Sequence, residues 1–289
     1  MDEERARVSE SEAYRRVSAL ERAGTLLGRM VPGGAVRRVL RRAYHTVISL
    51  RGGGRGVVAA LPGGERVRLL PQYRFVTWNP AEYAAFRAAS ARGGVALDVG
   101  ANVGAYTLLF ARWVHPGGRV YAFEPAPEAF DGLVRHLLLN ELREVVTPVC
   151  AAVSSSSGSA ALVADGVAGT NRLAPSSSGS ASGDRTARVE TVSLDDFCAR
   201  EGVAPTVIKV DVEGAELEVL RGARQTLRRV GAGLAVFVEM HPTLWKEMGI
   251  GREDVIAELA SQGLRAEPLR PCDDPWALEG ECLRLARID

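Results

Sequence analysis

Leu97-Asp98-Val99-Gly100-Ala101-Asn102-Val103-Gly104 is the stretch of sequence that decides the fold. It joins a short apolar run, Val95–Val99, to a segment with helical periodicity that spans about Ala105–Val114. Glycines at such a junction allow a tight turn and close packing of helix on strand, and the first N–H groups of the helix can bind an anion. The stretch therefore predicts a strand, a ligand-binding turn and a helix.

Around this turn, short apolar strands alternate with helices along the chain. Strands buried on both faces, with helices between them, are typical of a parallel sheet covered on both sides. We therefore predict the α/β class, with a doubly wound, mostly parallel, Rossmann-like sheet. A last strand, Cys282–Ile288, is expected at its antiparallel edge. The other predicted strands are Val95–Val99, Arg119–Phe123, Val145–Val149, Val207–Val210 and Leu234–Glu239, and the predicted helices are Ala105–Val114, Glu128–Asn140 and Glu216–Val230.

The chain divides into three predicted parts. Residues 1–50 are expected to form an N-terminal helical arm, and residues 51–92 a small hairpin followed by an entry helix. Residues 93–289 form the main domain. Within it, residues 154–190 are rich in Ser and Gly and bury little apolar surface, so we predict a weakly ordered excursion with room for one strand pair. The hairpin strands and the entry helix are expected at Val57–Ala60, Arg66–Leu70 and Asn79–Ala91.

The arm carries an amphipathic pattern in its second half. Apolar residues recur at the spacing of one helix face, and arginines occupy the opposite face. Such a helix either docks on its own domain or a second subunit, or binds a membrane surface or nucleic acid. A net charge of +1 over 289 residues gives no reason to expect a polyanionic partner. We therefore expect a homodimer contact through the arm, with no membrane and no nucleic acid. The apolar positions are Val36, Val39, Leu40, Ala43, Tyr44, Val47 and Ile48.

Composition indicates a cellular compartment. The four cysteines lack the spacing of a structural zinc site, and we expect free thiols rather than a disulfide between Cys272 and Cys282. No apolar run reaches the roughly 18 residues that span a bilayer, and the charged N-terminus lacks the apolar core of a signal peptide. We therefore expect a cytoplasmic protein. Lysine occurs only at Lys209 and Lys246, and this strong preference for arginine suggests a GC-rich bacterial genome.

The residues of the glycine turn discriminate between two classes of ligand. A dinucleotide fingerprint needs G-x-G-x-x-G, but Asn102 and Ala105 stand where its second and third glycines would be. Asn102 would obstruct a pyrophosphate, and the carboxylate of Asp98 would repel one. The same carboxylate suits a ligand with a sulfonium and an ammonium group. We therefore favour S-adenosylmethionine, with a nicotinamide dinucleotide, and so an NAD-dependent oxidoreductase, as the alternative.

Glu124 follows the second strand of the sheet and lies 20 residues beyond Gly104. At this spacing an acidic side chain accepts hydrogen bonds from the two ribose hydroxyls of a bound nucleotide. Both candidate ligands share that contact. The predicted ligand-binding residues are Asp98, Gly100, Ala101, Asn102, Gly104, Tyr106, Thr107, Glu124, Pro125, Ala152, Ser154 and Asp211.

Five motifs in a fixed order resemble the FkbM family of methyltransferases. The resemblance covers residues 95–242, about half of the chain, and leaves out the arm and the serine-rich excursion. It implies a class I methyltransferase fold, S-adenosylmethionine as donor, and methyl transfer, usually to a hydroxyl oxygen. The motifs are VALDVGANVGAYT (95–107), RVYAFEPAPEAF (119–130), VSLDDF (192–197), VIKVDVEGAELEVLRGA (207–223) and VFVEMHP (236–242).

Titratable side chains follow two further strands. Alternation places Lys209, Asp211 and Glu213 on one side after the fourth strand, and Glu239 and His241 on one side after the fifth. The ends of neighbouring parallel strands meet at one edge of the sheet, so we expect these groups to converge.

Three interpretations of this cluster stay open. In the first, His241 is a general base, and Asp211 faces the sulfonium and the acceptor. In the second, Asp211, Glu239 and His241 hold Mg²⁺ or a similar ion. In the third, the cluster is a structural ion-pair network. The candidate catalytic residues are His241, Asp211, Glu239 and Lys209, the last of which could neutralise its acidic neighbours.

The favoured function is an O-methyltransferase that acts on a small hydroxylated acceptor, such as a sugar or a specialised metabolite made in natural-product biosynthesis. A non-catalytic module that keeps the fold and binds a partner is the alternative from another class.

Overall fold

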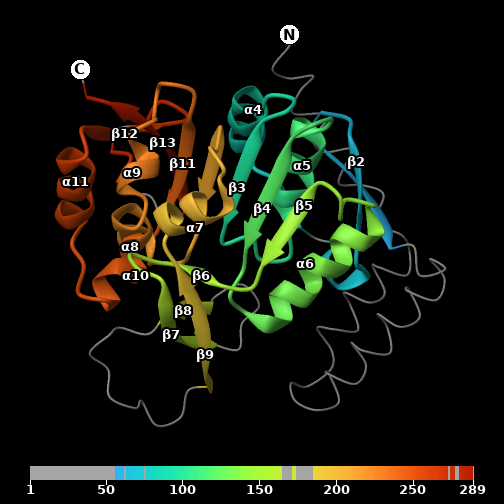
Figure 1. Cartoon of the computed structure of the whole chain (residues 1–289), viewed down its shortest axis with the longest axis horizontal. Helices are drawn as coiled ribbons and strands as arrows, with labels where there is room; N and C mark the ends of the chain where they lie inside the picture. Colours follow the sequence, from blue (N-terminus) through green and yellow to red (C-terminus); the bar gives the residue numbers. More distant parts are fainter. Residues whose placement is uncertain are drawn as a thin grey trace. The chain divides into compact units, whose positions relative to one another are not determined.

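The core of the protein is a seven-stranded sheet with the strand order β12-β13-β11-β10-β3-β4-β5 (Figure 1). Six of its strands run in one direction, and only β13, which pairs with β11 and β12, runs antiparallel to them. The predicted doubly wound, mostly parallel sheet is therefore confirmed. The strands that share one direction are β3 (Val95–Val99), β4 (Arg119–Phe123), β5 (Val146–Val149), β10 (Val207–Val210), β11 (Ala235–Met240) and β12 (Leu264–Pro268); the antiparallel one is β13 (Glu281–Arg287).

The computed structural model describes residues 56–61, 63–74, 76–164, 171–173, 185–272, 274–276 and 280–288. The predicted arm at residues 1–50 and residues 165–170 and 174–184 of the serine-rich excursion lie outside this part. The chain divides into two compact units, Met1–Val57 and Val58–Asp289, and nearly all of the described residues belong to the second. Within the described residues, no helix has the length and apolar character that a membrane span requires.

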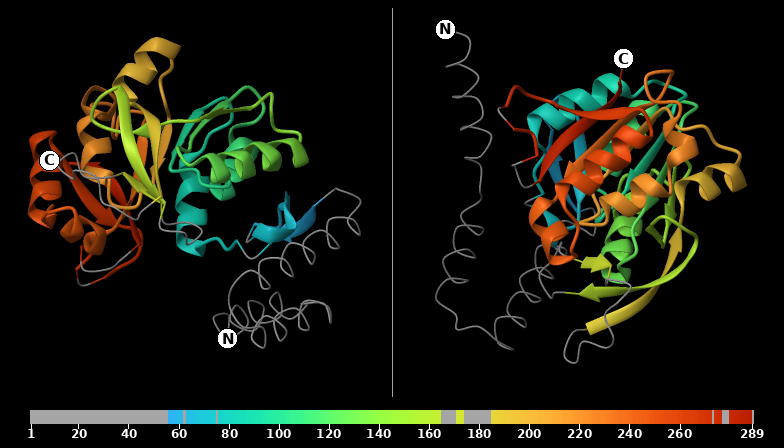
Figure 2. Two further views of the ribbon diagram at one scale, coloured as in Figure 1. Left: turned by 90° about the horizontal axis from the view of Figure 1, so that it is seen from below. Right: turned by 90° about the vertical axis from the view of Figure 1, so that its left-hand side faces the viewer.

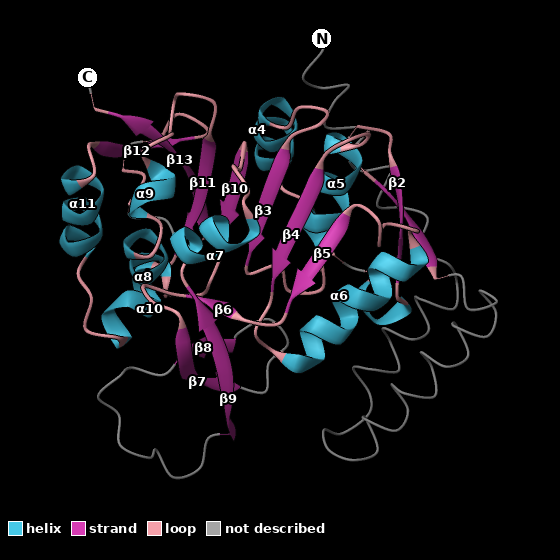
Figure 3. Ribbon diagram, in the orientation of Figure 1, coloured by secondary structure: helices cyan, strands magenta, loops and turns pink. Residues whose placement is uncertain are grey.

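Helices cover both faces of the sheet (Figure 3). On one face, Phe86 of α4 stacks on Phe110 of α5 and contacts Phe237 of β11. On the other face, Phe197 of α7 packs edge-on against Phe123 of β4. Strand side chains alternate between these two layers, as the period of a strand requires. The helices are α4 (Pro80–Ala89), α5 (Ala105–Val114), α6 (Pro127–Leu139), α7 (Leu194–Glu201), α8 (Glu216–Arg221), α9 (Arg224–Leu227), α10 (Pro242–Glu247) and α11 (Arg252–Ser261).

One predicted helix is divided in two. The single helix expected at Glu216–Val230 is wrong, because the structure has α8 and α9 with Gly222 between them. The carboxylate of Asp195 accepts the N–H groups of Gln225 and Thr226, and so caps α9 as a separate helix. The predicted place of the last strand is also wrong: β13 is antiparallel but lies inside the sheet, between β11 and the edge strand β12.

A second, four-stranded sheet replaces the predicted weakly ordered excursion where the chain is described. Its order is β6-β9-β7-β8, and it lies beyond the carboxyl ends of β3, β4 and β5 (Figures 1 and 2). Leu162 and Val189 give this sheet a small apolar core with Ala126 and Ala152, which explains why it is ordered. The strands are β6 (Ala152–Val153), β7 (Gly158–Ala164), β8 (Asn171–Leu173) and β9 (Arg185–Val192).

The hairpin and the entry helix form as predicted. Strands β1 (Val57–Ala60) and β2 (Arg66–Leu69) pair in a two-stranded sheet, followed by the short 3-10 helix η1 (Pro71–Tyr73). Asn79 caps α4 through its side chain, which accepts the N–H of Ala81. His136 of α6 links the hairpin to the glycine turn: its Nε2 accepts the N–H of Leu70, and its Nδ1 contacts the carbonyl of Val103 at 2.6 Å.

Candidate active site

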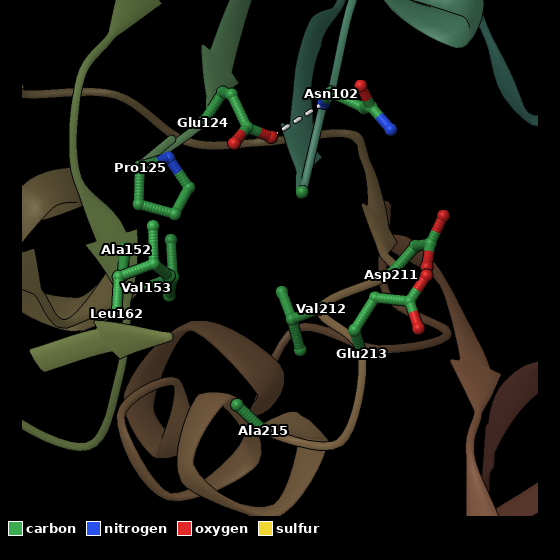
Figure 4. A pocket seen from close by; sticks show the side chains of 11 residues that line it. Asn102, Glu124, Pro125, Ala152, Val153, Leu162, Asp211, Val212, Glu213 and Ala215 are labelled. Carbon is green, nitrogen blue, oxygen red and sulfur yellow. Dashed lines mark hydrogen bonds between the residues drawn. The ribbon is translucent and has the colours of Figure 1, made fainter. Parts of the chain in front are cut away.

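A cavity opens at the carboxyl ends of the parallel strands (Figure 4). One end is apolar and the other is acidic, with Glu124 and Asn102 between them. The cavity therefore suits an elongated ligand with an aromatic base at one end and positive charge at the other. The lining residues are Gly100, Asn102, Glu124, Pro125, Ala152, Val153, Leu162, Asp211, Val212, Glu213 and Ala215.

The glycine turn brings three strand ends together. The N–H groups of Gly100 and Ala101 both donate to the carbonyl of Phe123 at the end of β4. Gly100 has a φ of +79°, and a Cβ at this position would lie 1.7 Å from the carbonyl oxygen of Asp211 at the end of β10. Only glycine permits both this conformation and this approach. The turn thus sets the distance between β3 and β10 at the floor of the cavity.

Two lining residues hold a left-handed backbone without being glycines. Asn102 has a φ of 49° and Glu213 a φ of 52°. Such conformations are strained for side chains other than Gly and collect at functional sites, where the surrounding structure enforces them. Both strained residues line the cavity, so the surrounding structure enforces an unfavourable backbone conformation at the candidate site.

Glu124 has its carboxylate fixed on both oxygens. Oε2 accepts the N–H of Asn102 and Oε1 the N–H of Ala126, each at 2.8 Å. Burial raises the pKa of this carboxyl to about 7, although the two backbone hydrogen bonds oppose the rise. Each carboxylate oxygen keeps a further lone pair, so Glu124 can still accept two ligand hydroxyls.

Of the predicted ligand-binding residues, Gly100, Asn102, Glu124, Pro125, Ala152 and Asp211 line the cavity. The apolar end also contains Val153 and Leu162, which the sequence did not single out. Leu162 belongs to β7, so its contribution depends on the small sheet.

The other predicted ligand-binding residues do not line the cavity. Asp98 is 1 % exposed, and its Oδ2 accepts the hydroxyl of Thr107 at 2.5 Å. Tyr106 donates its hydroxyl to Glu82 at 2.5 Å. Ser154 donates its N–H to the carbonyl of Val192. Buried Ala101 and the α5 cap Gly104 shape the turn through their backbones. Direct ligand contacts by these residues remain predictions.

Lys209 is a buried cation among acidic groups at the end of β10. Its side chain is 4 % exposed, and Nζ lies 3.0 Å from Asp211 Oδ2 and 4.0 Å from Asp98 Oδ1. Burial would lower the pKa of this ammonium, but Asp211 and Asp98 outweigh it and raise the pKa. Asp98 Oδ1 has no hydrogen-bond partner among the described residues. Lys209 therefore stays charged and compensates part of the negative charge of the two aspartates.

His241 stands at the centre of the acidic end. Its Nδ1 lies 2.7 Å from Glu216 Oε1, and its Nε2 lies 3.8 Å from Glu239 and 3.9 Å from both Asp211 and Glu213. The predicted convergence of the two strand ends is thus observed. Burial lowers the pKa of His241, but the hydrogen bond and charge of Glu216, with Asp211 and Glu213, raise it to about 9.

The acidic end also perturbs Glu239. Burial and the neighbouring charge of Asp211 raise the pKa of this carboxyl to about 8, against the opposing effects of Lys209 and His241. Asp211, Glu239 and His241 each offer one ligand atom, and these atoms lie within 4.8 Å of one another. Of these atoms, the two carboxylate oxygens are of the kind that suits Mg²⁺ or Mn²⁺, whereas an imidazole nitrogen suits zinc, copper, iron or nickel.

Two buried acids that hold the cluster in place escaped the sequence analysis. Glu216 is fully buried and contacts His241, and Glu82 of the entry helix contacts Tyr106. Glu216 was interpreted only as the beginning of a helix. The signal that could have revealed it is the tryptophan at position 245, four residues after His241, whose Nε1 donor also needs an acceptor.

The sheet and its cavity define an α/β protein that binds its ligand at the carboxyl ends of parallel strands. A family model, the methyltransferase FkbM domain, matches residues 98–265, more than half of the chain. The chain belongs to this family of S-adenosylmethionine-dependent methyltransferases, and its sheet is that of the class I methyltransferase fold. The resemblance noted in the sequence is confirmed.

Three curated relatives are named methyltransferases. Hexuronic acid methyltransferase AglP of Haloferax volcanii is 32% identical over 171 residues, which cover 59% of this chain and 63% of the relative. Methyltransferase sdnD of Sordaria araneosa is 33% identical, with 44% of this chain and 59% of the relative covered. The 31-O-demethyl-FK506 methyltransferase FkbM of Streptomyces tacrolimicus is 54% identical over 48 residues, covering 15% of this chain and 18% of the relative. The chain thus spans less than two thirds of each relative.

Solved structures match over a larger share of the chain. Methyltransferase FkbM from Methylobacillus flagellatus has 16% sequence identity and a TM-score of 0.43, with 75% of this chain and 47% of that one covered. An S-adenosylmethionine-dependent O-methyltransferase from Thermotoga maritima has 14% identity and a TM-score of 0.43, with 81% and 78% covered.

Proposed function

We propose that this protein is an S-adenosylmethionine-dependent O-methyltransferase that acts on a hydroxyl of a small molecule, a sugar or a specialised metabolite. The observation that carries the proposal is that Asp211 and Glu213 line the cavity and also lie 3.9 Å from Nε2 of His241. Glu124 lines one part of the cavity, and the acidic residues that follow β10 line another. A bound donor would contact both.

The described residues fit the donor along the length of the cavity. The apolar walls formed by Pro125, Val153 and Leu162 suit an adenine ring, and the free lone pairs of Glu124 suit the ribose hydroxyls. The acidic end attracts the sulfonium and the ammonium group. When bound, the donor supplies a methyl group already activated by positive sulfur, so the chain mainly has to align the two reactants.

In the proposed mechanism, Nε2 of His241 accepts the proton of the acceptor hydroxyl. This atom lies 3.9 Å from the carboxylate of Asp211 and 3.8 Å from that of Glu239. These charges stabilise the imidazolium that forms. Lys209 holds Asp211 in place by an ion pair and limits the build-up of negative charge.

A divalent cation bound by Asp211, Glu239 and His241 is the second candidate for activating the hydroxyl. Its support is the spacing of the three ligand atoms. A cation would also compensate the crowded carboxylates. Loss of activity in EDTA, restored by Mg²⁺, would favour the cation, whereas full activity in EDTA would favour His241 as the base.

The acceptor class rests on the named relatives. The named relatives act on a hexuronic acid and on 31-O-demethyl-FK506, which supports a sugar or a natural product. We further propose a cytoplasmic location and a dimer contact through residues 1–50.

Calorimetry with S-adenosylmethionine and S-adenosylhomocysteine tests the donor. We expect both to bind, and NADH, titrated by fluorescence, not to bind. A folded sample that binds neither adenosyl compound at millimolar concentration would refute the function.

Exchanging His241 for Asn tests the base. We expect H241N to lower kcat by roughly 10²–10⁴-fold, the range for general acid–base catalysis, while the Kd of S-adenosylhomocysteine changes little. Wild-type turnover in H241N would exclude His241 as the base.

A further inference from the structure

Glu216 at the beginning of α8 is a carboxylate enclosed by the protein. Its side chain is 0 % exposed, and it meets three donors from three places in the chain. His241 Nδ1 lies 2.7 Å from Oε1, Trp245 Nε1 donates to Oε2 at 2.5 Å, and the N–H of Gly214 donates to Oε1 at 3.0 Å. Trp245 and Gly214 therefore fix the carboxylate independently of the histidine.

These contacts determine which nitrogen of His241 carries the proton in the neutral ring. An ionised carboxylate only accepts hydrogen bonds, so the short contact to Glu216 requires a proton on Nδ1. The lone pair of the neutral ring then lies on Nε2. That atom is the one directed toward Asp211, Glu213 and Glu239 at 3.8–3.9 Å.

Burying the charged carboxylate of Glu216 costs free energy unless other groups compensate the charge. A carboxylate without water needs a cationic partner or several donors to remain ionised. Among the described residues, His241 is the only cationic group in ion-pair distance of Glu216. The charge of Glu216 is therefore directed at His241, whose Nε2 lies 3.9 Å from the cavity-lining residues Asp211 and Glu213.

We propose that Glu216 is a positioning residue that holds His241 in the tautomer with its proton on Nδ1, so that Nε2 is free to accept the proton of the acceptor hydroxyl. The inference rests on the proposed function. The acceptor O–H gives its proton to Nε2 as its oxygen forms a bond to the donor methyl carbon. The carbon–sulfur bond breaks, and its electron pair stays on sulfur as a neutral thioether. Glu216 then faces the imidazolium and stabilises it.

The discriminating variant is E216A, which removes the acceptor of the Nδ1 proton. The carboxylates of Asp211, Glu213 and Glu239 near Nε2 then favour the tautomer with its proton on Nε2, which has no lone pair there. We expect kcat to fall by roughly 10²–10⁴-fold, the scale seen when a histidine base is held in the wrong tautomer. The Kd of S-adenosylhomocysteine should stay within about twofold of the wild-type value.

A matched control separates positioning from a structural role. W245F removes one donor to Glu216 but keeps the Glu216–His241 contact. W245F should therefore keep the tautomer with its proton on Nδ1, whereas E216A should lose it. A variant that lowers kcat but keeps the wild-type tautomer would indicate only structural damage.

Nitrogen-15 NMR of histidine side chains decides the tautomer without turnover. At a pH at which the ring is neutral, wild-type His241 should carry its proton on Nδ1, with the signal assigned by its absence in folded H241N. A proton on Nε2 in the wild type would overturn the proposal, as would wild-type kcat in E216A. Failure of donor binding would refute the proposed function instead, because the tautomer is measured in the free protein.

Discussion

At the scale of single residues, Glu124 shows how one carboxylate can serve structure and ligand together. Its two oxygens accept backbone N–H groups from the β3 turn and from the beginning of α6. The same carboxylate lies in the lining of the cavity. A side chain fixed in advance loses little conformational freedom when the ligand binds, which favours affinity.

Substitution of Glu124 tests its assigned role. E124A should weaken S-adenosylhomocysteine binding by about 1–3 kcal/mol, the range for losing hydrogen bonds to a charged group. Calorimetry measures the change, and E128A, which alters an exposed residue on α6, is the control. An affinity equal to that of the wild type would exclude a contact with the ribose.

The pH dependence of donor binding follows from the same residue. The pKa of Glu124 is raised to about 7 by burial, so the carboxyl of the free protein ionises as the pH rises through 7. The ionised form accepts both ribose hydroxyls. The affinity for S-adenosylhomocysteine should therefore increase from pH 6 to about pH 8, and this increase should vanish in E124Q.

The candidate site residues could be predicted from the local sequence pattern, but the residues that contact them could not. Asp211, Glu239 and His241 could be predicted because alternation along a strand and the common edge of a parallel sheet place them together. Glu216 could not be separated from other acidic residues that begin helices. Its role depends on Trp245, and that contact exists only after α8 and α10 have packed against each other.

At the scale of elements, the predicted bounds agree best with the structure for the elements that are buried. Strands β3, β4 and β10 and helix α5 have the predicted bounds, because continuous apolar runs and a glycine turn define them. Strand β12 was missed because it has only one fully buried residue, Leu264. Without β12, nothing in the sequence indicated that β13 lies inside the sheet, since strand order depends on pairing between distant segments.

The turn at Gly100 permits a test with a matched control. G93A and G100A both place a side chain at a φ near +80°, but only Gly100 packs against the backbone of Asp211. G93A should lower the free energy of unfolding by about 1–2 kcal/mol, the cost of a left-handed backbone. G100A should cost more and also weaken donor binding. Denaturant unfolding and calorimetry measure both effects, and equal results for the two variants would contradict the close approach of β3 and β10.

At the scale of the whole molecule, residues of both the seven-stranded sheet and the small four-stranded sheet line the cavity. Gly100 and Glu124 come from the ends of the main sheet, and Leu162 comes from the small sheet. The serine-rich excursion is thus part of the wall around the ligand. This could not be predicted from composition, because a few alternating apolar residues order a segment that is otherwise polar.

Amide hydrogen exchange should show that both sheets contribute residues to the wall of the cavity. Saturating S-adenosylhomocysteine should slow amide exchange at the ends of β3, β4 and β10 and also in β7 of the small sheet. At a ligand concentration 100 times the Kd, the stability should rise by about 2.7 kcal/mol. Protection confined to the main sheet would show that Leu162 does not contact the ligand.

The burial of Lys209 has a practical consequence for labelling. The chain has two lysines, and Lys246 is exposed on α10, the helix that begins next to His241. An amine-reactive dye applied to the native protein should therefore attach at Lys246 and leave Lys209 unmodified, as peptide mapping can verify. Apart from the terminal amine, the protein thus offers a single natural attachment point beside its active site. A fluorophore placed there would report on acceptors as they arrive, without any engineered cysteine.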